Sequence, residues 1–235
     1  DIDDPAIFSY DPKTRTARST ASLYVNYKAE LTIGREDDPA FKETLKLDAV
    51  AIQVWAGKLR IYNSAIAFKK GKNSMISKWV NSELIARNAD ISGLFDIRVS
   101  KGGKIFLHGC TLHDSHYGVF SATSIVGCKF ENNATLTYLY PTTFVDCEIT
   151  NTGMYPNCKI TYLNTTDHML KKRYFTTGHL TVKWYLDVEV VDDKGQGVPG
   201  TEVLLSGKNG AENLRGKTDG TGKCRLEPTQ CVIDK

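Results

Sequence analysis

Residues 109–150 read GCTLHDSHYGVFSATSIVGCKFENNATLTYLYPTTFVDCEIT, and this stretch decides the fold. Within it, a Gly or Asp followed by Cys, a polar residue and an apolar residue recurs at 109–112, 127–130 and 146–149. The three cysteines are 18 and 19 residues apart, a spacing typical of single coils in a parallel β-helix. Such a coil cannot bury its apolar side alone, so the core exists only where coils stack.

Related segments lie on both sides, at 63–66 (NSAI), 88–91 (NADI) and 157–160 (NCKI). Between them, apolar and polar residues alternate over short runs, and Gly, Asn, Asp or Ser mark the bends. The run 77–87 (SKWVNSELIAR) has a partial helical period, but we expect strands there too. Cys110, Cys128 and Cys147 occupy one position of successive coils, which predicts a buried ladder of thiols with a structural role.

Three stretches carry a family resemblance. The segments HYGVF (116–120) and SIVGCKFENN (124–133) are similar to a recurring coil of the pectin-lyase-like superfamily, and LTIG (31–34) is similar to its opening coils. The resemblance implies a right-handed parallel β-helix, which we place at residues 25–166, after an N-terminal cap or extension at residues 1–24. It favours no single function, because lyases, hydrolases, epimerases, adhesins and scaffolds share this fold.

The pattern changes after Asp167, and we interpret residues 167–179 as a linker. The strings VVDDKGQGVPGTEVLLSG (190–207) and GKTDGTGKCRL (216–226) resemble the carboxypeptidase-regulatory-like, transthyretin-like family. That resemblance implies a small Ig-like β-sandwich over residues 180–235, with turn glycines where the family has them. Modules of this family are usually non-catalytic parts of exported proteins. The stretch holds fewer strands than the family normally has, which predicts an incomplete sandwich or one completed by a partner.

The chain has 235 residues and a formal net charge of +3. No apolar run approaches the roughly 20 residues that span a bilayer, and the even charge balance does not suit a dedicated nucleic-acid binder. The first residue is Asp and no leader precedes it, so we interpret the chain as a processed or excised part of an exported protein.

Two further features fit an oxidising, extracellular compartment. Cys224 and Cys231 flank a turn-like segment and are the candidate disulfide. Asn133 and Asn164 begin N-x-S/T triplets and are the candidate N-glycosylation sites. Disulfides and N-linked sugars both belong to exported proteins, so we expect an extracellular or cell-surface location.

A polysaccharide lyase on this fold needs acidic residues, often with calcium, and a Lys or Arg base on one outer sheet. A glycoside hydrolase needs carboxylates that converge on one bond. Glu131, Asp146 and Glu148 are the leading candidates for an acidic or glycan-binding patch on neighbouring coils. The remaining acidic and basic candidates are Asp90, Asp96, Asp114, Arg98 and Lys129. Polar residues face outward on any β-helix, so we assign no catalytic residue and expect no cofactor, with calcium as the alternative.

Histidines and tyrosines supply two weaker candidates. The densest set of metal-ligand types is His108, His113, Asp114 and His116. Strand alternation gives no argument that they converge, so we expect exposed histidines near a bend, with a metal site as the alternative. Tyr117 and Tyr138, with Tyr140 and Tyr155, are candidates for an exposed stripe that stacks on sugar rings; the alternative is that they pack against the coils.

We therefore expect a non-catalytic structural or adhesive part of a cell-surface protein, acting as a spacer or assembly unit. Its partners would be the rest of a larger polypeptide or further copies of itself. The alternative is a polysaccharide lyase, glycoside hydrolase or glycan-binding module that uses the outer face of the β-helix. A third, weaker reading is an inactive fragment of a larger enzyme.

Overall fold

The structure is a computed structural model that describes residues 7–69, 71, 74–78, 81–99, 102–120, 123–138, 141–156, 158–170, 178–207 and 212–233. Within these ranges the chain forms strands and turns and has no α-helix, which confirms the all-β class. The run 77–87 contributes to β9 (Met75–Lys78) and β10 (Glu83–Arg87), as predicted. None of the described segments is a helix with the length and apolar character needed to cross a bilayer.

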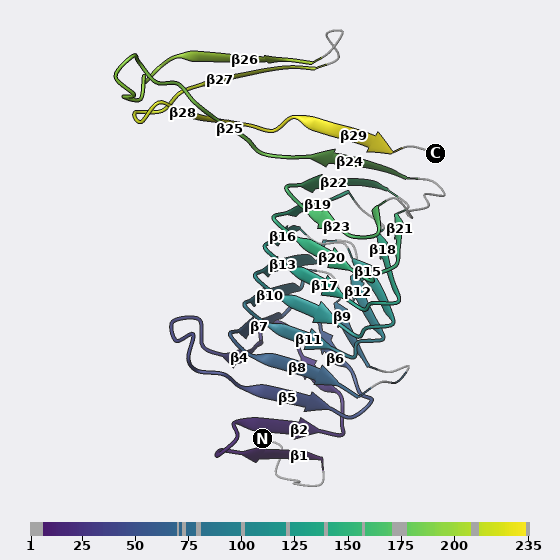
Figure 1. Ribbon diagram of the computed structural model, residues 1–235. Helices are drawn as coiled ribbons and strands as arrows, with labels where there is room; N and C mark the ends of the chain where they lie inside the picture. Colours follow the sequence, from purple (N-terminus) through teal and green to yellow (C-terminus); the bar gives the residue numbers. More distant parts are fainter. Residues whose placement is uncertain are drawn as a thin grey trace.

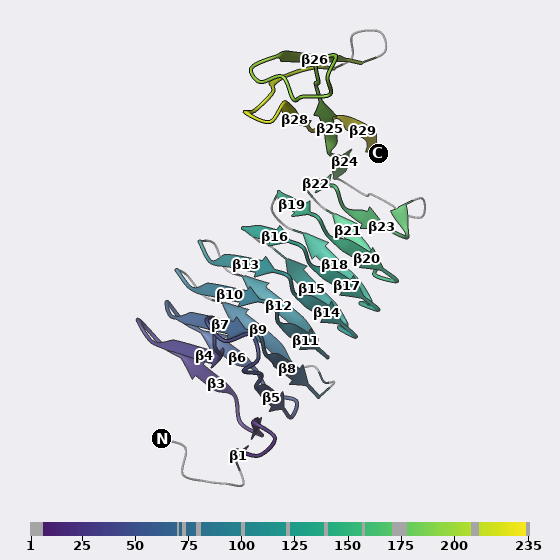
Figure 2. The same cartoon turned by 60° about the vertical axis from the view of Figure 1, so that its left-hand side comes forward.

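Each turn of the chain contributes one strand to each of three faces. β13 (Lys104–His108), β14 (Thr111–His113) and β15 (Tyr117–Phe120) form one such coil. The next coil begins at β16 (Ser124–Val126), which pairs in parallel with β13. Stacked coils make the column seen in Figures 1 and 2. The predicted β-helix is therefore confirmed as a parallel β-solenoid.

The column has three faces, numbered 1 to 3, and each consists of one set of strands. Face 1 consists of β4 (Glu30–Gly34), β7 (Lys58–Tyr62), β10, β13, β16, β19 (Thr142–Val145), β22 (Lys159–Leu163) and β24 (His179–Lys183). Face 2 consists of β2 (Thr16–Ser19), β5 (Thr44–Leu47), β8 (Ala65–Phe68), β11 (Asp90–Ser92), β14, β17 (Lys129–Glu131), β20 (Glu148–Thr150) and β23 (Thr166–Asp167). Face 3 consists of two shorter sheets, one of β3 (Leu23–Val25), β6 (Ile52–Val54), β9 and β12 (Asp96–Val99), the other of β15, β18 (Thr135–Tyr138) and β21 (Met154–Pro156).

Both ends of the column carry an antiparallel strand. β1 (Phe8–Asp11) pairs antiparallel with β2 at one end, and β29 (Thr229–Ile233) pairs antiparallel with β24 at the other. The edge of each of these two sheets is therefore a short antiparallel strand and not a solenoid strand. The parallel pairing begins with β2 and β5 and continues to β24, so the solenoid sheets extend into both the predicted N-terminal region and the predicted C-terminal module.

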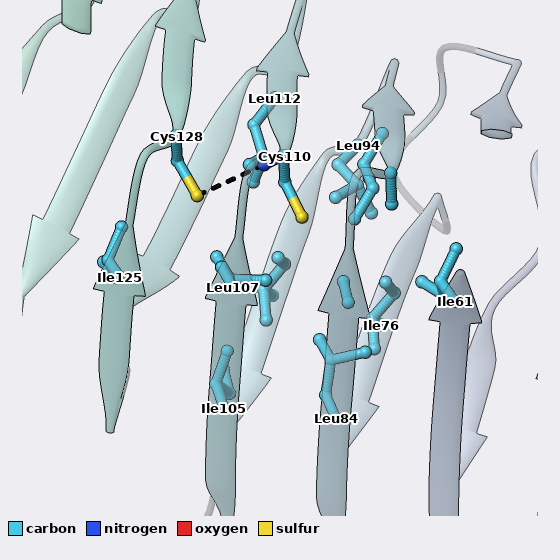
Figure 3. Packing of buried hydrophobic residues seen from close by; sticks show 14 of the residues in the cluster. Ile61, Ile76, Leu84, Leu94, Ile105, Leu107, Cys110, Leu112, Ile125 and Cys128 are labelled. Atoms are coloured by element: carbon cyan, nitrogen blue, oxygen red, sulfur yellow. Dashed lines mark hydrogen bonds between the residues drawn. The ribbon is translucent and has the colours of Figure 1, made fainter. Parts of the chain in front are cut away.

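The core is a set of parallel stacks of apolar side chains inside the column. On face 1, Leu107 is in register with Ile125, which is in register with Phe144. The ring of Phe144 meets those of Phe130 and Tyr162 edge-on, each at 5.5 Å between centroids. Figure 3 shows the stacked aliphatic side chains between the strands. Burying each such side chain stabilises the fold by about 1.5–3 kcal/mol.

The corner between faces 1 and 2 repeats a two-residue device. Its first residue has positive φ in successive coils: Asn63, Asn88, Gly109, Gly127, Asp146 and Asn164. Asn and Asp tolerate this left-handed conformation better than other side chains, and glycine adopts it freely. At Gly109 a Cβ would also lie only 2.5 Å from the Asn88 side-chain oxygen. The sequence pattern of Gly, Asn or Asp at the bends thus follows from the backbone conformation that each bend requires.

The second residue of this corner is small and buried, and from Cys110 onward its backbone N–H donates to the side chain at the same position of the coil that follows it. The backbone N–H of Cys110 donates to Cys128 Sγ at 3.4 Å, drawn as the dashed line in Figure 3. The N–H of Cys128 donates in turn to Cys147 Sγ at 3.4 Å, and that of Cys147 to Thr165 Oγ1 at 3.2 Å. The predicted thiol ladder is present, and a threonine continues it. Cys158, which the sequence pattern placed next in this series, lies instead before β22, between faces 3 and 1.

The corner between faces 2 and 3 repeats the same device with other residues. Asp114, Asn132 and Asn151 have positive φ there. The buried residue that follows Asn132 is Asn133, whose side-chain oxygen accepts the N–H of Ser115 at 3.1 Å and whose amide nitrogen donates to the Leu112 carbonyl at 2.9 Å. Corner side chains therefore satisfy backbone groups that no strand ladder reaches.

Residues 184–207 and 212–228, named here the arm, project from the end of the column in Figure 1. In the arm, β25 (Leu186–Glu189) pairs antiparallel with β28 (Lys223–Leu226), and β26 (Glu202–Ser206) pairs antiparallel with β27 (Asn213–Lys217). These are two separate two-stranded sheets.

Candidate functional site

The outer side of face 2 carries a ladder of charged side chains. Its strands are short, and alternation directs their middle residues inward and the flanking residues outward. The outward residues include Asp90 on β11, His113 on β14, Lys129 and Glu131 on β17, and Glu148 on β20. These positions are in register between coils, with Lys129 opposite Glu148. Face 2 is therefore where the predicted acidic patch must be tested.

Two of the three predicted carboxylates contact side chains of adjacent coils. Glu148 Oε2 lies 3.5 Å from Lys129 Nζ, and its Oε1 lies 3.4 Å from His168 Nε2. Asp146 lies at the corner and accepts the Asn164 side-chain amide at 2.6 Å. Glu131 is in register with Thr150, one outward position away from Glu148. Two of the three carboxylates are thus held by a neighbour on the next coil, an arrangement that stabilises stacking.

Both ring nitrogens of His113, on face 2, face a carboxylate. Its Nε2 lies 2.9 Å from Asp90 Oδ1 on the preceding coil, and its Nδ1 lies 2.7 Å from Asp114 Oδ2. Partial burial lowers the pKa of His113, but hydrogen bonds and charge attraction from both carboxylates outweigh it, and the pKa is raised from its usual value. The imidazole acts as a bridge between two coils.

The other histidines of the predicted ligand set lie elsewhere. His108 is on face 1, with its Nε2 3.2 Å from Ser124 Oγ. His116 follows the second corner and stacks edge-on against Phe95 at 5.4 Å. Among the described residues, no three His, Cys, Asp or Glu side chains are grouped closely enough to hold a metal ion.

A shallow hollow of about 520 Å³ opens at the corner between faces 2 and 3. Its lining includes Asp114, His116, Asn132, Asn151 and Met169. Asn151 donates its amide to Asn132 at 2.9 Å, so two of these lining side chains belong to the corner device. Asp96, another acidic candidate, is buried. The hollow presents hydrogen-bonding groups to solvent without a nucleophile held against a base.

The tyrosine stripe falls on β15 and β18. Tyr117 is opposite Thr135, and Tyr138 is opposite Phe120, three positions further along the pair. The side chains of Tyr117, Tyr138 and Tyr155 lie outside the described part of the structure, as do that of Arg98 and the whole of Tyr140. The backbone register therefore places Tyr117 and Tyr138 three positions apart along the paired strands, and not opposite each other.

The cysteines divide into buried and accessible groups. A hydrogen bond from Cys110 lowers the pKa of the Cys128 thiol, but the hydrogen bond with Cys147 and burial prevail and raise it to about 12. Such a thiol is inert as a nucleophile. Cys224 is opposite Val188 in the arm, whereas Cys231 is opposite Val182 on face 1. Both are free thiols, so the predicted disulfide is not formed.

The two glycosylation candidates differ in accessibility. Asn133 is 2% exposed and its amide nitrogen is committed to the Leu112 carbonyl. A glycan on that nitrogen is incompatible with the folded coil, so this candidate is wrong for the folded protein. Asn164 is partly exposed but donates to Asp146, and modification there would break a corner contact.

One buried cation was missed by sequence reasoning. Lys78 is in register with Val54 in the inward row of face 3 and is 1% exposed. Its Nζ donates to the Lys104 carbonyl. Burial lowers the pKa of Lys78 to about 7, against a small opposing effect of Glu83. The alternation of the MISK segment was the available signal, because it places Lys78 in phase with Ile76.

An exposed aromatic patch was missed as well. Tyr24, Tyr27 and Trp55 are 64%, 70% and 61% exposed and lie at the beginning of face 3. The available signal was again alternation: in LYV and IQVW the aromatic rings fall out of phase with the inward valines.

Comparison with known proteins finds no matching family model, no matching curated protein and no matching solved structure.

Proposed function

We propose that the protein is a non-catalytic structural part of an exported, cell-surface protein, acting as a rigid spacer or assembly unit. The observation that carries the proposal is the charge ladder of face 2, where carboxylates are held by side chains of adjacent coils. Glu148 contacts Lys129 and His168, and Asp90 contacts His113. A glycoside hydrolase needs a pair of carboxylates directed at one substrate bond. Side chains that hold coils together serve a stiff column instead.

Two finer assignments belong to the same proposal. We propose that the solenoid is a right-handed coil of the pectin-lyase-like type; the support is the coil pattern at 116–133 and its stacked, in-register strands. We propose that the arm is part of a transthyretin-like sandwich. Its support is the two antiparallel two-stranded sheets and the turns at Gly195, Gly200 and Gly222, all with positive φ.

A particle-size measurement tests the spacer role. Small-angle scattering combined with light scattering on the purified chain is expected to show an elongated particle. Defined oligomers or filaments would support an assembly unit. A compact globule would overturn the rigid column, and a strict monomer at all concentrations would overturn self-assembly.

The alternative, an enzyme that uses face 2, is tested directly. A panel of neutral and uronate polysaccharides, with and without calcium, is incubated with the wild type, Glu131→Gln and Glu148→Gln. We expect neither new reducing ends nor unsaturated sugar products from the wild type. Product formation that either substitution abolishes would overturn the non-catalytic proposal.

A further inference from the structure

Lys78 is buried in the inward row of face 3, where the neighbouring positions are apolar. It follows Ile76 in the alternation of β9 and is in register with Val54 on β6 and Val99 on β12. The residue is 1% exposed. Within the described part of the structure, its Nζ has one hydrogen bond, donated to the Lys104 carbonyl, and no ion pair. An ammonium has three donors, so this site satisfies a neutral amine better than a charged one.

The charged residues of the strands around Lys78 alternate with the inward rows and do not belong to them. They are Lys58 and Arg60 on β7, Glu83 and Arg87 on β10, Asp96 and Arg98 on β12, and Lys104 and His108 on β13, whereas β6 has none. Burial lowers the pKa of Lys78 to about 7, against the attraction of Glu83. Ordinary carboxylates and exposed lysines keep their charge near that pH. Lys78 therefore gains or loses a charge inside the column near neutral pH.

A local movement is enough to bring the Lys78 amine into water. Lys78 is the last residue of β9, a strand of four residues in a four-stranded sheet. The lysine stem is long and flexible, and it can follow an apolar surface while its charged end reaches solvent. The end of a short strand opens at a lower free energy than the whole protein. Protonation is therefore relieved by release of the end of β9, while the coils further along the column stay stacked.

We propose that β9 is a pH-sensitive segment of the column, which opens locally when Lys78 takes up a proton. In the closed state the neutral amine donates to the Lys104 carbonyl. In the open state the ammonium lies in water, where its charge is solvated. This proposal goes beyond the spacer role, because it makes the rigidity of one coil depend on pH.

The pH range follows from which state binds the proton. A solvated lysine titrates near about 10.4, whereas the pKa of Lys78 in the closed state is about 7. Opening therefore takes up a proton between these values, and the fraction of open molecules increases as the pH falls from about 10 towards 7. Below about pH 6 both states are protonated, and the open fraction no longer changes with pH.

Hydrogen exchange followed by mass spectrometry tests the segment. The exchange of the β9 and β10 amides is compared between the wild type and Lys78→Met at each pH, so that intrinsic exchange rates cancel. Opening in the wild type relative to Lys78→Met should increase on the order of tenfold per pH unit from about pH 9 to about pH 7 and then level off. The matched control is Lys104→Met, which keeps the backbone carbonyl and changes an exposed side chain, and it should follow the wild type. Histidines also titrate in this range, but His108 is present in every variant and its effect cancels.

A second variant checks the sign of the effect. Lys78→Arg keeps its positive charge at every pH in this range, so β9 should be weakly protected throughout and its opening should not vary with pH. Circular dichroism melting checks that each variant is folded, and the comparison with Lys78→Met stands without Lys78→Arg.

Two results would overturn the proposal. One is a ratio of wild-type to Lys78→Met exchange that stays constant from about pH 9 to about pH 6. The other is an equal change in the amides of β17 and β20, several coils away, because the proton would then act on global stability and not on β9. Neither result bears on the spacer role, which the shape of the particle tests.

Discussion

The solenoid column and the arm are both built from short strands, but they bury their side chains in different ways. In the column, Ile91, Leu112, Phe130 and Ile149 follow one another in register inside face 2 and are at most 3% exposed. In the arm, Leu226 is buried, whereas Leu204 is 59% and Val191 49% exposed. A coil gains its core from the coil above and the coil below, whereas a hairpin of the arm has a neighbour on fewer sides. Stacking, more than the strands themselves, supplies the stability.

The largest contrast between the two regions should come from deleting an apolar side chain. Phe130→Ala removes a ring packed against Phe144 and should lower the free energy of unfolding by about 3–5 kcal/mol. Leu204→Ala in the arm should change it by less than about 0.5 kcal/mol. Urea unfolding followed by circular dichroism measures both. Equal losses in the free energy of unfolding would contradict this contrast and show that the arm has a core of its own.

Buried Lys78 should make the stability of the column depend on pH in a way that the arm does not share. The folded pKa of Lys78 is about 7, below the value of about 10.4 for an unfolded lysine. The folded state therefore excludes a proton that the unfolded state binds, which costs stability as the pH falls from about 10.4 towards 7. Lys78→Met should raise the free energy of unfolding by on the order of 3 kcal/mol near pH 7, with a smaller gain at higher pH. The matched control is Lys223→Met in the arm, an exposed position, which should show no such trend; a pH-independent gain at Lys78 would contradict the prediction.

The corner device should matter next. Asn133→Ala leaves the Ser115 N–H and the Leu112 carbonyl without the partners they now have. A buried polar group without a partner costs about 1–3 kcal/mol, so we expect a loss of about 2 kcal/mol in urea unfolding. Asn213→Ala, at an exposed position of the arm, should be nearly neutral. If Asn133→Ala leaves the free energy of unfolding unchanged, the prediction is wrong, and water must satisfy the two backbone groups in place of the side chain.

The smallest expected effect is the bridge made by His113. Its pKa is raised in the folded state, so the bridge is fully present below the unfolded pKa of about 6.5 and is lost as the pH rises through the higher folded value. His113→Gln should therefore cost about 0.5 kcal/mol more near about pH 5.5 than near about pH 8.5. In the arm, Asp187 pairs with Arg225 at 2.7 Å, and neither group titrates in this range. Asp187→Asn should accordingly give a loss that does not vary with pH.

The repeat was readable from the sequence because its corners impose strict demands on residue type. A left-handed bend admits Gly, Asn or Asp, and the buried position after it admits only small side chains, so Gly109-Cys110 and Gly127-Cys128 repeat visibly. The same rule explains the misplaced segment at Cys158. The ladder continues at Thr165, whose hydroxyl accepts the Cys147 N–H as a thiol would. A search for cysteines finds one residue type only. The corner position instead requires a small side chain with an acceptor atom, which Thr provides as well as Cys.

The candidate sites were less readable because they depend on spatial neighbours. Asn133 matches a glycosylation triplet, yet it is a buried corner residue. Glu131 and Glu148 were correctly expected on neighbouring coils, but the Lys129 and His168 contacts to Glu148 required the register. The rings of Tyr24 and Trp55 are separated by 31 residues in the sequence and become neighbours only when β3 pairs with β6.

The direction of the corner hydrogen bonds also bears on the order in which the coils can form during synthesis. Cys110 donates to Cys128, Cys128 to Cys147, and Cys147 to Thr165, so each coil is completed by residues from the coil that follows it. On a ribosome, a newly emerged coil has its bend but lacks the acceptor for it until the next turn of chain appears. The last coil to emerge is therefore the one whose corner N–H still lacks its partner.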